Sequence, residues 1–188
     1  MLKQYHRVGL PLIVTFLFLL CYSVSFAAGN NFSADVIMKN DNEIANGKIF
    51  VSGNKSRFEI EGMITISRMD KKVVWMLMAD EKMYMEQKMI PSQGIPRSEA
   101  AENEVERVFL GKESVDNKEC NKYRITVLDE GKKSSSLLWL AVDSGFPLKM
   151  ASEDGTWSQE YRNLIIAAQP DHLFEIPAGY EKVSIPGM

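Results

Sequence analysis

The chain has 188 residues, which is enough for one ordinary domain and too few for two comfortable ones. Its composition, 45% hydrophobic and 25% charged, is that of a globular protein and excludes a largely disordered chain. Lysine and arginine total 22 against 25 acidic residues, so the net charge of −3 argues against nucleic-acid binding through a broad positive surface. Two histidines and two cysteines supply a His/Cys metal centre poorly.

The first 27 residues are predicted to be a secretory signal peptide. Lys3 and Arg7 precede an apolar run over residues 8–26, and the small residues Ser25 and Ala27 predict cleavage after Ala27. A retained transmembrane anchor is the alternative, but the run is barely long enough and polar residues follow it directly. We therefore expect a periplasmic protein that keeps no membrane span after cleavage, with residues 28–188 as a single open-barrel domain.

Removal of the signal peptide also removes Cys21 and leaves Cys120 without an intramolecular partner. In an oxidising compartment this cysteine is either a buried small hydrophobe, which we expect, or a means of intermolecular pairing.

From Phe32 onward, short β-rich runs alternate with turn signals at intervals of about ten residues, which is typical of an antiparallel sheet closed or curled on itself. The fold is predicted to be mainly β, a curled antiparallel meander that forms an open, incomplete barrel with a short helix or loop over one side. Residues 98–108 are rich in helix formers and follow a Pro- and Gly-containing loop, so they are the predicted helix. The turn pairs are Gly53-Asn54, Glu61-Gly62, Asp70-Lys71, Asp116-Asn117, Glu130-Gly131, Ser144-Gly145 and Asp154-Gly155.

The spacing of four turns predicts the register of five strands, because paired residues of an antiparallel ladder point to the same face. We take the first three pairs as two-residue loops and residues 79–82 as a four-residue loop. Counting outward then places one set of apolar residues on a single face, called here the methionine face: Ile49, Val51, Phe58, Ile60, Met63, Met76, Met78, Met83 and Met85.

The opposite, mixed face carries both charged and apolar side chains. Lys48 is predicted to lie opposite Glu59 as an ion pair. The apolar part of this face is too large to remain in water, so the 98–108 segment, a neighbouring element or a partner is expected to cover it. Near the end of the chain, residues 170–180 (P-D-H-L-F-E-I-P-A-G-Y) are predicted to form a C-terminal hook. The hook is expected to tuck Leu173, Phe174 and Tyr180 against the sheet.

Four segments together resemble a family of uncharacterised bacterial envelope proteins: F-S-A-D-V-I-M-K, G-K-I-F-V-S-G-N-K-S-R-F-E-I, V-V-W-M-L-M-A-D-E-K-M-Y-M-E and D-H-L-F-E-I-P-A-G-Y. That family is similar to the Lol superfamily of periplasmic lipoprotein carriers and outer-membrane lipoprotein receptors. The resemblance runs from about residue 32 to residue 180 and implies an unclosed antiparallel barrel whose concave side holds acyl chains. The carriers have a helix before their first strand, which this chain has little room for, and an arginine near the mouth, where Arg57 lies on the predicted mixed face.

The resemblance and the methionine face together predict a periplasmic binding protein or carrier for a lipid, an acylated protein or another long apolar ligand. Methionine is unbranched and polarisable, so it adapts to flexible partners better than β-branched side chains do. The nine residues of the methionine face are the predicted ligand-binding residues. The alternative that these methionines fill an ordinary core stays open, and no cofactor is predicted.

Two further functions compete with the carrier. A structural or adaptor protein of the envelope would use a surface around Trp75, Leu77 and Tyr84 to meet an envelope partner. A soft-metal protein would bind cuprous ion through the Met76-x-Met78 and Met83-x-Met85 pairs, although thioethers are weak ligands.

An enzyme is the least expected class, because one histidine after the signal peptide supplies no Ser/His/Asp or Cys/His set. His172 is predicted to be a capping or surface residue.

Overall fold

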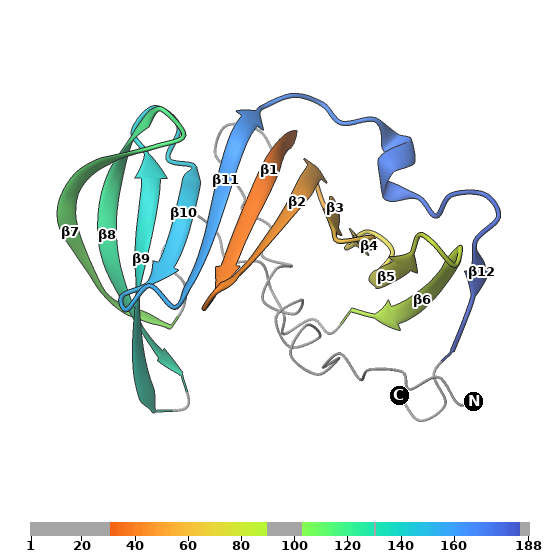
Figure 1. Ribbon diagram of the computed structural model, residues 1–188, viewed down its shortest axis with the longest axis horizontal. Helices are drawn as coiled ribbons and strands as arrows, with labels where there is room; N and C mark the ends of the chain where they lie inside the picture. Colours follow the sequence, from red (N-terminus) through yellow and green to blue (C-terminus); the bar gives the residue numbers. More distant parts are fainter. Residues whose placement is uncertain (1–30, 90–102, 130, 185–188) are drawn as a thin grey trace, which may run out of the picture.

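The computed structural model describes residues 31–89, 103–129 and 131–184, so the predicted signal peptide lies outside the described residues. Twelve strands form one sheet in the order β12-β6-β5-β4-β3-β2-β1-β11-β10-β9-β8-β7 (Figure 1). The first half is a meander of six strands: β1 (Asn31–Asn40), β2 (Glu43–Ser52), β3 (Lys55–Ile60), β4 (Met63–Arg68), β5 (Val73–Met78) and β6 (Met83–Lys88).

The second half is a meander of five strands followed by the C-terminal elements: β7 (Glu104–Val115), β8 (Lys118–Asp129), β9 (Lys132–Ala141), β10 (Pro147–Ser152), β11 (Trp157–Ile165), the 3-10 helix η1 (Asp171–Phe174) and β12 (Glu181–Lys182). The two meanders join where β1 pairs with β11. All these pairs are antiparallel except the short β12–β6 pair, which is parallel. The strands β6 and β7 lie toward opposite ends of the sheet, so the sheet is not closed and the predicted open barrel is confirmed.

The predicted register of the first meander is confirmed pair by pair. Ile49 lies opposite Phe58, and Met63 lies opposite both Ile60 and Met78. Between β5 and β6, Met78 pairs with Met83 and Met76 with Met85. The β4–β5 turn spans residues 69–72 rather than the two residues predicted, but Arg68 still faces Val73, so the faces are unchanged. Lys48 does lie opposite Glu59, whereas the ion pair of Glu59 is with Arg57.

The main hydrophobic core lies where the two meanders meet. Phe146 is almost fully buried and contacts the rings of Phe32 and Tyr161 edge-on, with ring centroids 5.1 and 5.6 Å apart. Burial raises the pKa of the Tyr161 hydroxyl to about 12. Cys120 is fully buried in this cluster, which confirms the predicted small hydrophobe, and burial raises the pKa of its thiol.

The C-terminal hook packs on the outer side of the curve that β2–β6 make (Figure 1). The prediction that the hook packs against the sheet is confirmed, since Phe174 is fully buried against Ile66, Trp75 and Leu77, and Leu173 and Tyr180 pack beside them. These sheet residues belong to the mixed face, whose cover the sequence left open. His172 is exposed, as predicted. The methionine face is the opposite face of the same strands and therefore lies on the inner, concave side.

The predicted helix over residues 98–108 is wrong for the residues that are described. Residues 104–108 belong to β7, and residues 98–102 lie outside the described residues. Helix-forming residues favoured the prediction, but pairing of β7 along most of β8 overrides that local preference.

Candidate functional site: the methionine face and a cleft beside it

Five methionines stand in two adjacent rows across β4, β5 and β6. Met63, Met78 and Met83 are directly opposite one another and form one row, and Met76 and Met85 form the next. Directly opposed residues in an antiparallel sheet have Cβ atoms about 5 Å apart, so each thioether reaches its neighbours. The result is a continuous sulfur-rich surface on the concave side of the sheet.

Burial divides the methionine face into two parts. Ile49, Val51 and Phe58 are buried and belong to the main core. The remaining residues are only half-buried: Ile60, Met63, Met76, Met78, Met83 and Met85. The face therefore begins inside the closed core and continues into a surface that has accessible area left for another molecule.

The mixed face has no such accessible area in its centre. Leu77 is 1% exposed and Trp75 is 6% exposed, because the C-terminal hook covers them, and Tyr84 packs at the margin of the same cluster. The partner surface predicted through Trp75, Leu77 and Tyr84 is therefore covered by the chain itself. The sequence predicted both the hook and the need for a cover over the mixed face, but it did not indicate that the hook is this cover.

Charged groups fasten the hook at its turn. The guanidinium of Arg68, 5% exposed, donates to the Phe174 carbonyl at 3.1 Å and to the Asp70 carboxylate at 2.9 and 2.6 Å, and it also pairs with Glu175. These hydrogen bonds from Arg68 lower the pKa of Asp70 to about 2, and the same contacts raise the pKa of Arg68. Lys71 pairs with Glu175 at 3.1 Å.

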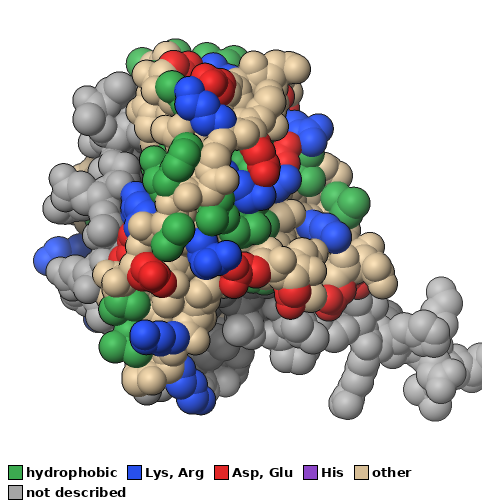
Figure 2. Space-filling view, turned by 90° about the vertical axis from the view of Figure 1, so that its left-hand side faces the viewer, with side chains coloured by type: hydrophobic (Ala, Val, Ile, Leu, Met, Phe, Trp, Pro, Cys, Tyr) green, Lys and Arg blue, Asp and Glu red, His purple; other side chains and the backbone are tan. Residues whose placement is uncertain are grey.

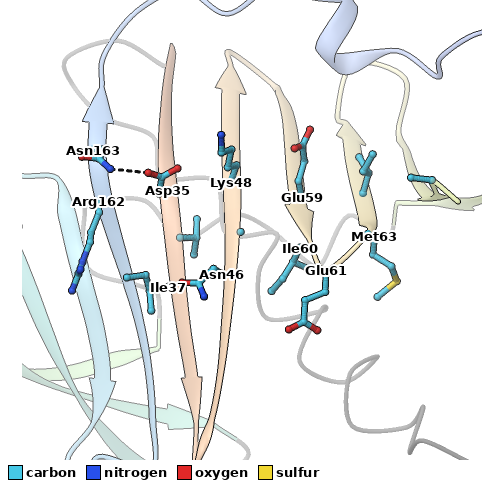
Figure 3. Close-up of a pocket in the computed structure, with 15 residues that line it drawn as sticks. Asp35, Ile37, Asn46, Lys48, Glu59, Ile60, Glu61, Met63, Arg162 and Asn163 are labelled. Atoms are coloured by element: carbon cyan, nitrogen blue, oxygen red, sulfur yellow. Dashed lines mark hydrogen bonds between the residues drawn. The ribbon is translucent and has the colours of Figure 1, made fainter.

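A cleft of about 600 Å³ adjoins the methionine face at the end of the β3–β4 hairpin (Figure 3). The turn residues Glu61 and Gly62 both have positive φ, 46° and 81°, as a tight two-residue hairpin turn requires. Gly47, on β2, lets the β3 backbone approach closely, since a Cβ there would lie 2.4 Å from the Glu59 carbonyl oxygen. Ile60 and Met63 line both the cleft and the methionine face.

The polar wall of the cleft is a row of alternating charges across four adjacent strands: Arg162, Asp35, Lys48 and Glu59. Asn163 donates to Asp35 at 2.7 Å, Arg57 donates to Glu59 at 2.5 Å, and Arg162 pairs with Glu160 at 2.7 Å.

Within the described residues the ammonium of Lys48 and the carboxylate of Glu61 make no hydrogen bond or ion pair, so both are available to a ligand. Sequence reasoning did not identify this cleft. The feature of the sequence that could have indicated the cleft is that the β1–β2 hairpin is longer than the β3–β4 hairpin.

Two negative findings apply to the described residues only. They contain no group of three or more His, Cys, Asp or Glu side chains arranged to hold a metal ion. No helix among them has the length and apolar character needed to cross a lipid bilayer.

The fold and the accessible concave face place the chain in a class of mainly β proteins built on one open, curled sheet. The chain belongs to the DUF4412 family, a domain of unknown function, whose model matches residues 33–144. The predicted membership of an uncharacterised family is thereby confirmed. Among curated proteins, none matches the chain.

Solved structures of MucB share the fold at low sequence identity. MucB of Pseudomonas aeruginosa in complex with MucA is 16% identical, with a TM-score of 0.54 over 82% of this chain and 58% of that chain. A structure of MucB alone gives 15% identity and a TM-score of 0.51, covering 88% of this chain and 64% of that one. The chain thus spans less than two-thirds of the MucB chains. The Mycobacterium tuberculosis lipoprotein LppX is 9% identical, with a TM-score of 0.44 over 83% of this chain and 91% of its own.

Proposed function

We propose that this chain is an exported envelope protein that binds a long apolar ligand, such as the acyl chain of a lipid or of an acylated protein, on the methionine face. The observation that carries the proposal is the pair of half-buried methionine rows on the concave side of β4–β6. MucB, which shares the fold, forms a complex with MucA, and this supports a binding role for the present chain.

The choice of side chains supports an exchangeable ligand over a permanent core. Where the same strands pack permanently, against the hook, the buried residues are Ile66, Trp75 and Leu77. Where they are accessible, the residues are methionines, which adapt to partners of variable shape. Burial of a dozen methylenes of an acyl chain contributes roughly 10 kcal/mol before the costs of association, which is ample for a stable complex.

The most direct test is native mass spectrometry of the protein purified from the cell envelope, followed by solvent extraction. We expect a defined mass of lipid or of an acylated molecule to accompany the protein and to be recovered in the extract. Repeated recovery of a well-folded protein with no apolar molecule, together with no binding of added fatty acid, would show that the methionines only fill a core.

A pair of matched variants locates the ligand. Met78→Gln with Met83→Gln keeps the side-chain length but makes the inner face polar, and we expect at least tenfold weaker binding of a pyrene-labelled fatty acid. Met69→Gln is the control, because Met69 lies in the β4–β5 turn and is 37% exposed. Equal affinities of both variants, with unchanged circular dichroism, would place the fatty acid elsewhere.

Cuprous ion is a second candidate ligand of the same face, because the observed register sets Met76 opposite Met85 and Met78 opposite Met83. Uptake of one equivalent of metal that bathocuproine removes, and that the Met78→Gln and Met83→Gln variant loses, would favour this candidate.

A further inference from the structure

The strand β2 has an open stretch of edge. It pairs with β1 along its whole length, from Glu43 opposite Asn40 to Ser52 opposite Asn31, but with β3 only from Gly47 onward. In the described part of the chain, no strand pairs with residues 43–46 on the β3 side. Figure 3 shows β1 and β2 continuing past the point at which β3 ends beside Glu61.

In residues 43–46 of β2, the backbone N–H and C=O groups that do not bond to β1 point toward the side that β3 does not reach. The Asp41 N–H donates to the carbonyl of Thr156, the residue before β11, at 2.6 Å. Because alternate residues of a strand bond to opposite neighbours, the odd-numbered residues at this end of β1 bond to β11 and the even-numbered ones bond to β2. Their partners Glu43 and Ala45 therefore bond to β1. The intervening residues Ile44 and Asn46 must direct both N–H and C=O groups away from β1, to the side where β3 is absent.

The side chains around this edge are accessible. Ile44 is 63% exposed, the largest exposed fraction among the large hydrophobic side chains described. Asn46 and Lys48 are exposed on the same face of β2, and within the described residues neither side chain makes a hydrogen bond or an ion pair. Asn46, Lys48 and Glu61 also line the 600 Å³ cleft, so the open edge and the cleft form one site.

The strand β7, which lies at one end of the sheet, is built differently from the open stretch of the interior strand β2. The β7–β8 register shifts between Glu104 and Glu106 and again between Phe109 and Gly111. Bulges and charged side chains are the usual means of protecting an edge from unwanted pairing. Figure 2 shows this side of the molecule with apolar side chains interspersed among charged ones. The β1–β2 register, in contrast, runs through residues 43–46 without a shift.

We propose that residues 43–46 of β2 are a docking site for an extended segment of a partner polypeptide, which adds as a short strand in line with β3 and antiparallel to β2. Ile44 offers an N–H donor and a C=O acceptor and Asn46 offers its N–H, and addition of a strand to an edge satisfies such groups. The segment carries an apolar side chain opposite Ile44 and, two residues away on the same face, a polar side chain opposite Asn46 near Lys48 and Glu61.

The dimensions of the site favour a single partner strand over a second copy of this chain. Pairing of two copies through four residues each would bury far less than the roughly 1,200 Å² of a stable interface. The end of the β3–β4 hairpin also borders the cleft at Glu61 and Gly62, which leaves room for one extended chain. The docking site is the edge of β2 rather than the methionine face, so it does not require an apolar ligand on that face.

The test uses the purified full chain and an array of synthetic seven-residue peptides that carry a polar residue at position 3 and Val, Ile, Leu or Phe at position 5. We expect a subset to bind in fluorescence polarisation. We also expect the best peptide to slow hydrogen exchange of the Ile44 and Asn46 amides at least tenfold. The same peptides with an N-methylated residue at position 5 are the negative controls, because that residue lies opposite Ile44 and its N–H is the group that would donate to the Ile44 carbonyl.

Two variants of Asn46 distinguish binding through backbone hydrogen bonds from binding through side-chain contacts. Asn46→Pro removes an N–H that the β1 ladder does not use, so we expect a folded protein with at least tenfold weaker peptide binding. Asn46→Ser keeps the N–H, and we expect its affinity to stay within about threefold. Should Asn46→Pro misfold, Ile44→Lys replaces it, and weaker binding of the apolar peptides is expected.

Several outcomes overturn the proposal. Equal binding to Asn46→Pro and Asn46→Ser places the peptides elsewhere, and an array in which no peptide exceeds its N-methylated control removes the docking site. Amides of Ile44 and Asn46 that are already protected in the purified chain mean that the edge is covered by the chain itself or by a second copy. Light scattering then tells these two apart, since a second copy doubles the mass.

Discussion

The two faces of β4–β6 contrast a permanent contact with an accessible one. On the outer face, Ile66, Trp75 and Leu77 are covered by Phe174 of the hook, and ion pairs hold the hook in place. On the inner face the same strands present half-buried methionines. Shape-defined side chains suit a fixed partner, whereas flexible thioethers suit a changing one. The contrast indicates that the two faces have different functions, although they belong to the same three strands.

The largest expected effect tests whether the outer contact is permanent. Phe174→Ala should lower the free energy of unfolding by about 3–5 kcal/mol, because the ring is fully buried and its removal leaves a cavity between hook and sheet. Urea denaturation followed by fluorescence measures the loss. The matched control is Phe109→Ala, whose ring is 55% exposed and whose loss should change stability by no more than about 0.5 kcal/mol. A similar small effect at both positions would contradict a fixed hook.

A smaller effect is expected on the inner face. Met78→Ala should lower the free energy of unfolding by about 1–2 kcal/mol in the absence of a ligand, less than a fully buried methionine, because Met78 is only half-buried. Leu77→Ala on the adjacent residue, 1% exposed, should lower it by about 2–5 kcal/mol. The same denaturation experiment compares them. If Met78→Ala is as destabilising as Leu77→Ala, the inner face is a closed core and the contrast disappears.

The sequence predicted those parts of the molecule that depend on local counting. Turn spacing fixed the register of Ile49, Phe58, Met63 and Met78, because a slip by one residue would have moved charges onto the apolar face. It also predicted the hook, since Leu173 and Phe174 follow a recognisable end motif.

Other parts depend on contacts between distant segments, which local counting does not reach. Residues 104–108 form a strand because β8 is beside them. The ion pair of Glu59 goes to Arg57 on its own strand, although Lys48 lies directly opposite. The cleft arises from one hairpin being longer than its neighbour, so no motif marks it.

The smallest expected effect concerns the charges that fasten the outer contact. Hydrogen bonds from Arg68 lower the pKa of Asp70 from 3.8 to about 2 in the folded protein, so Asp70 stabilises the fold above about pH 4 and loses this contribution as the pH falls toward 2. The full shift corresponds to about 2 kcal/mol, but the Asp70 side chain is 34% exposed, so solvent screening reduces the expected contribution to about 1 kcal/mol. Asp70→Asn should therefore decrease the loss of stability between pH 5 and pH 2.5 by about 1 kcal/mol in urea denaturation.

Asp80→Asn, in the next turn, removes an exposed carboxylate that has no ion pair within the described residues, and it serves as the control. If the two variants lose stability in parallel as the pH falls, the Arg68–Asp70 contact adds nothing to the fastening of the hook, which then relies on the burial of Phe174 and on the contacts of Arg68 with the Phe174 carbonyl and Glu175.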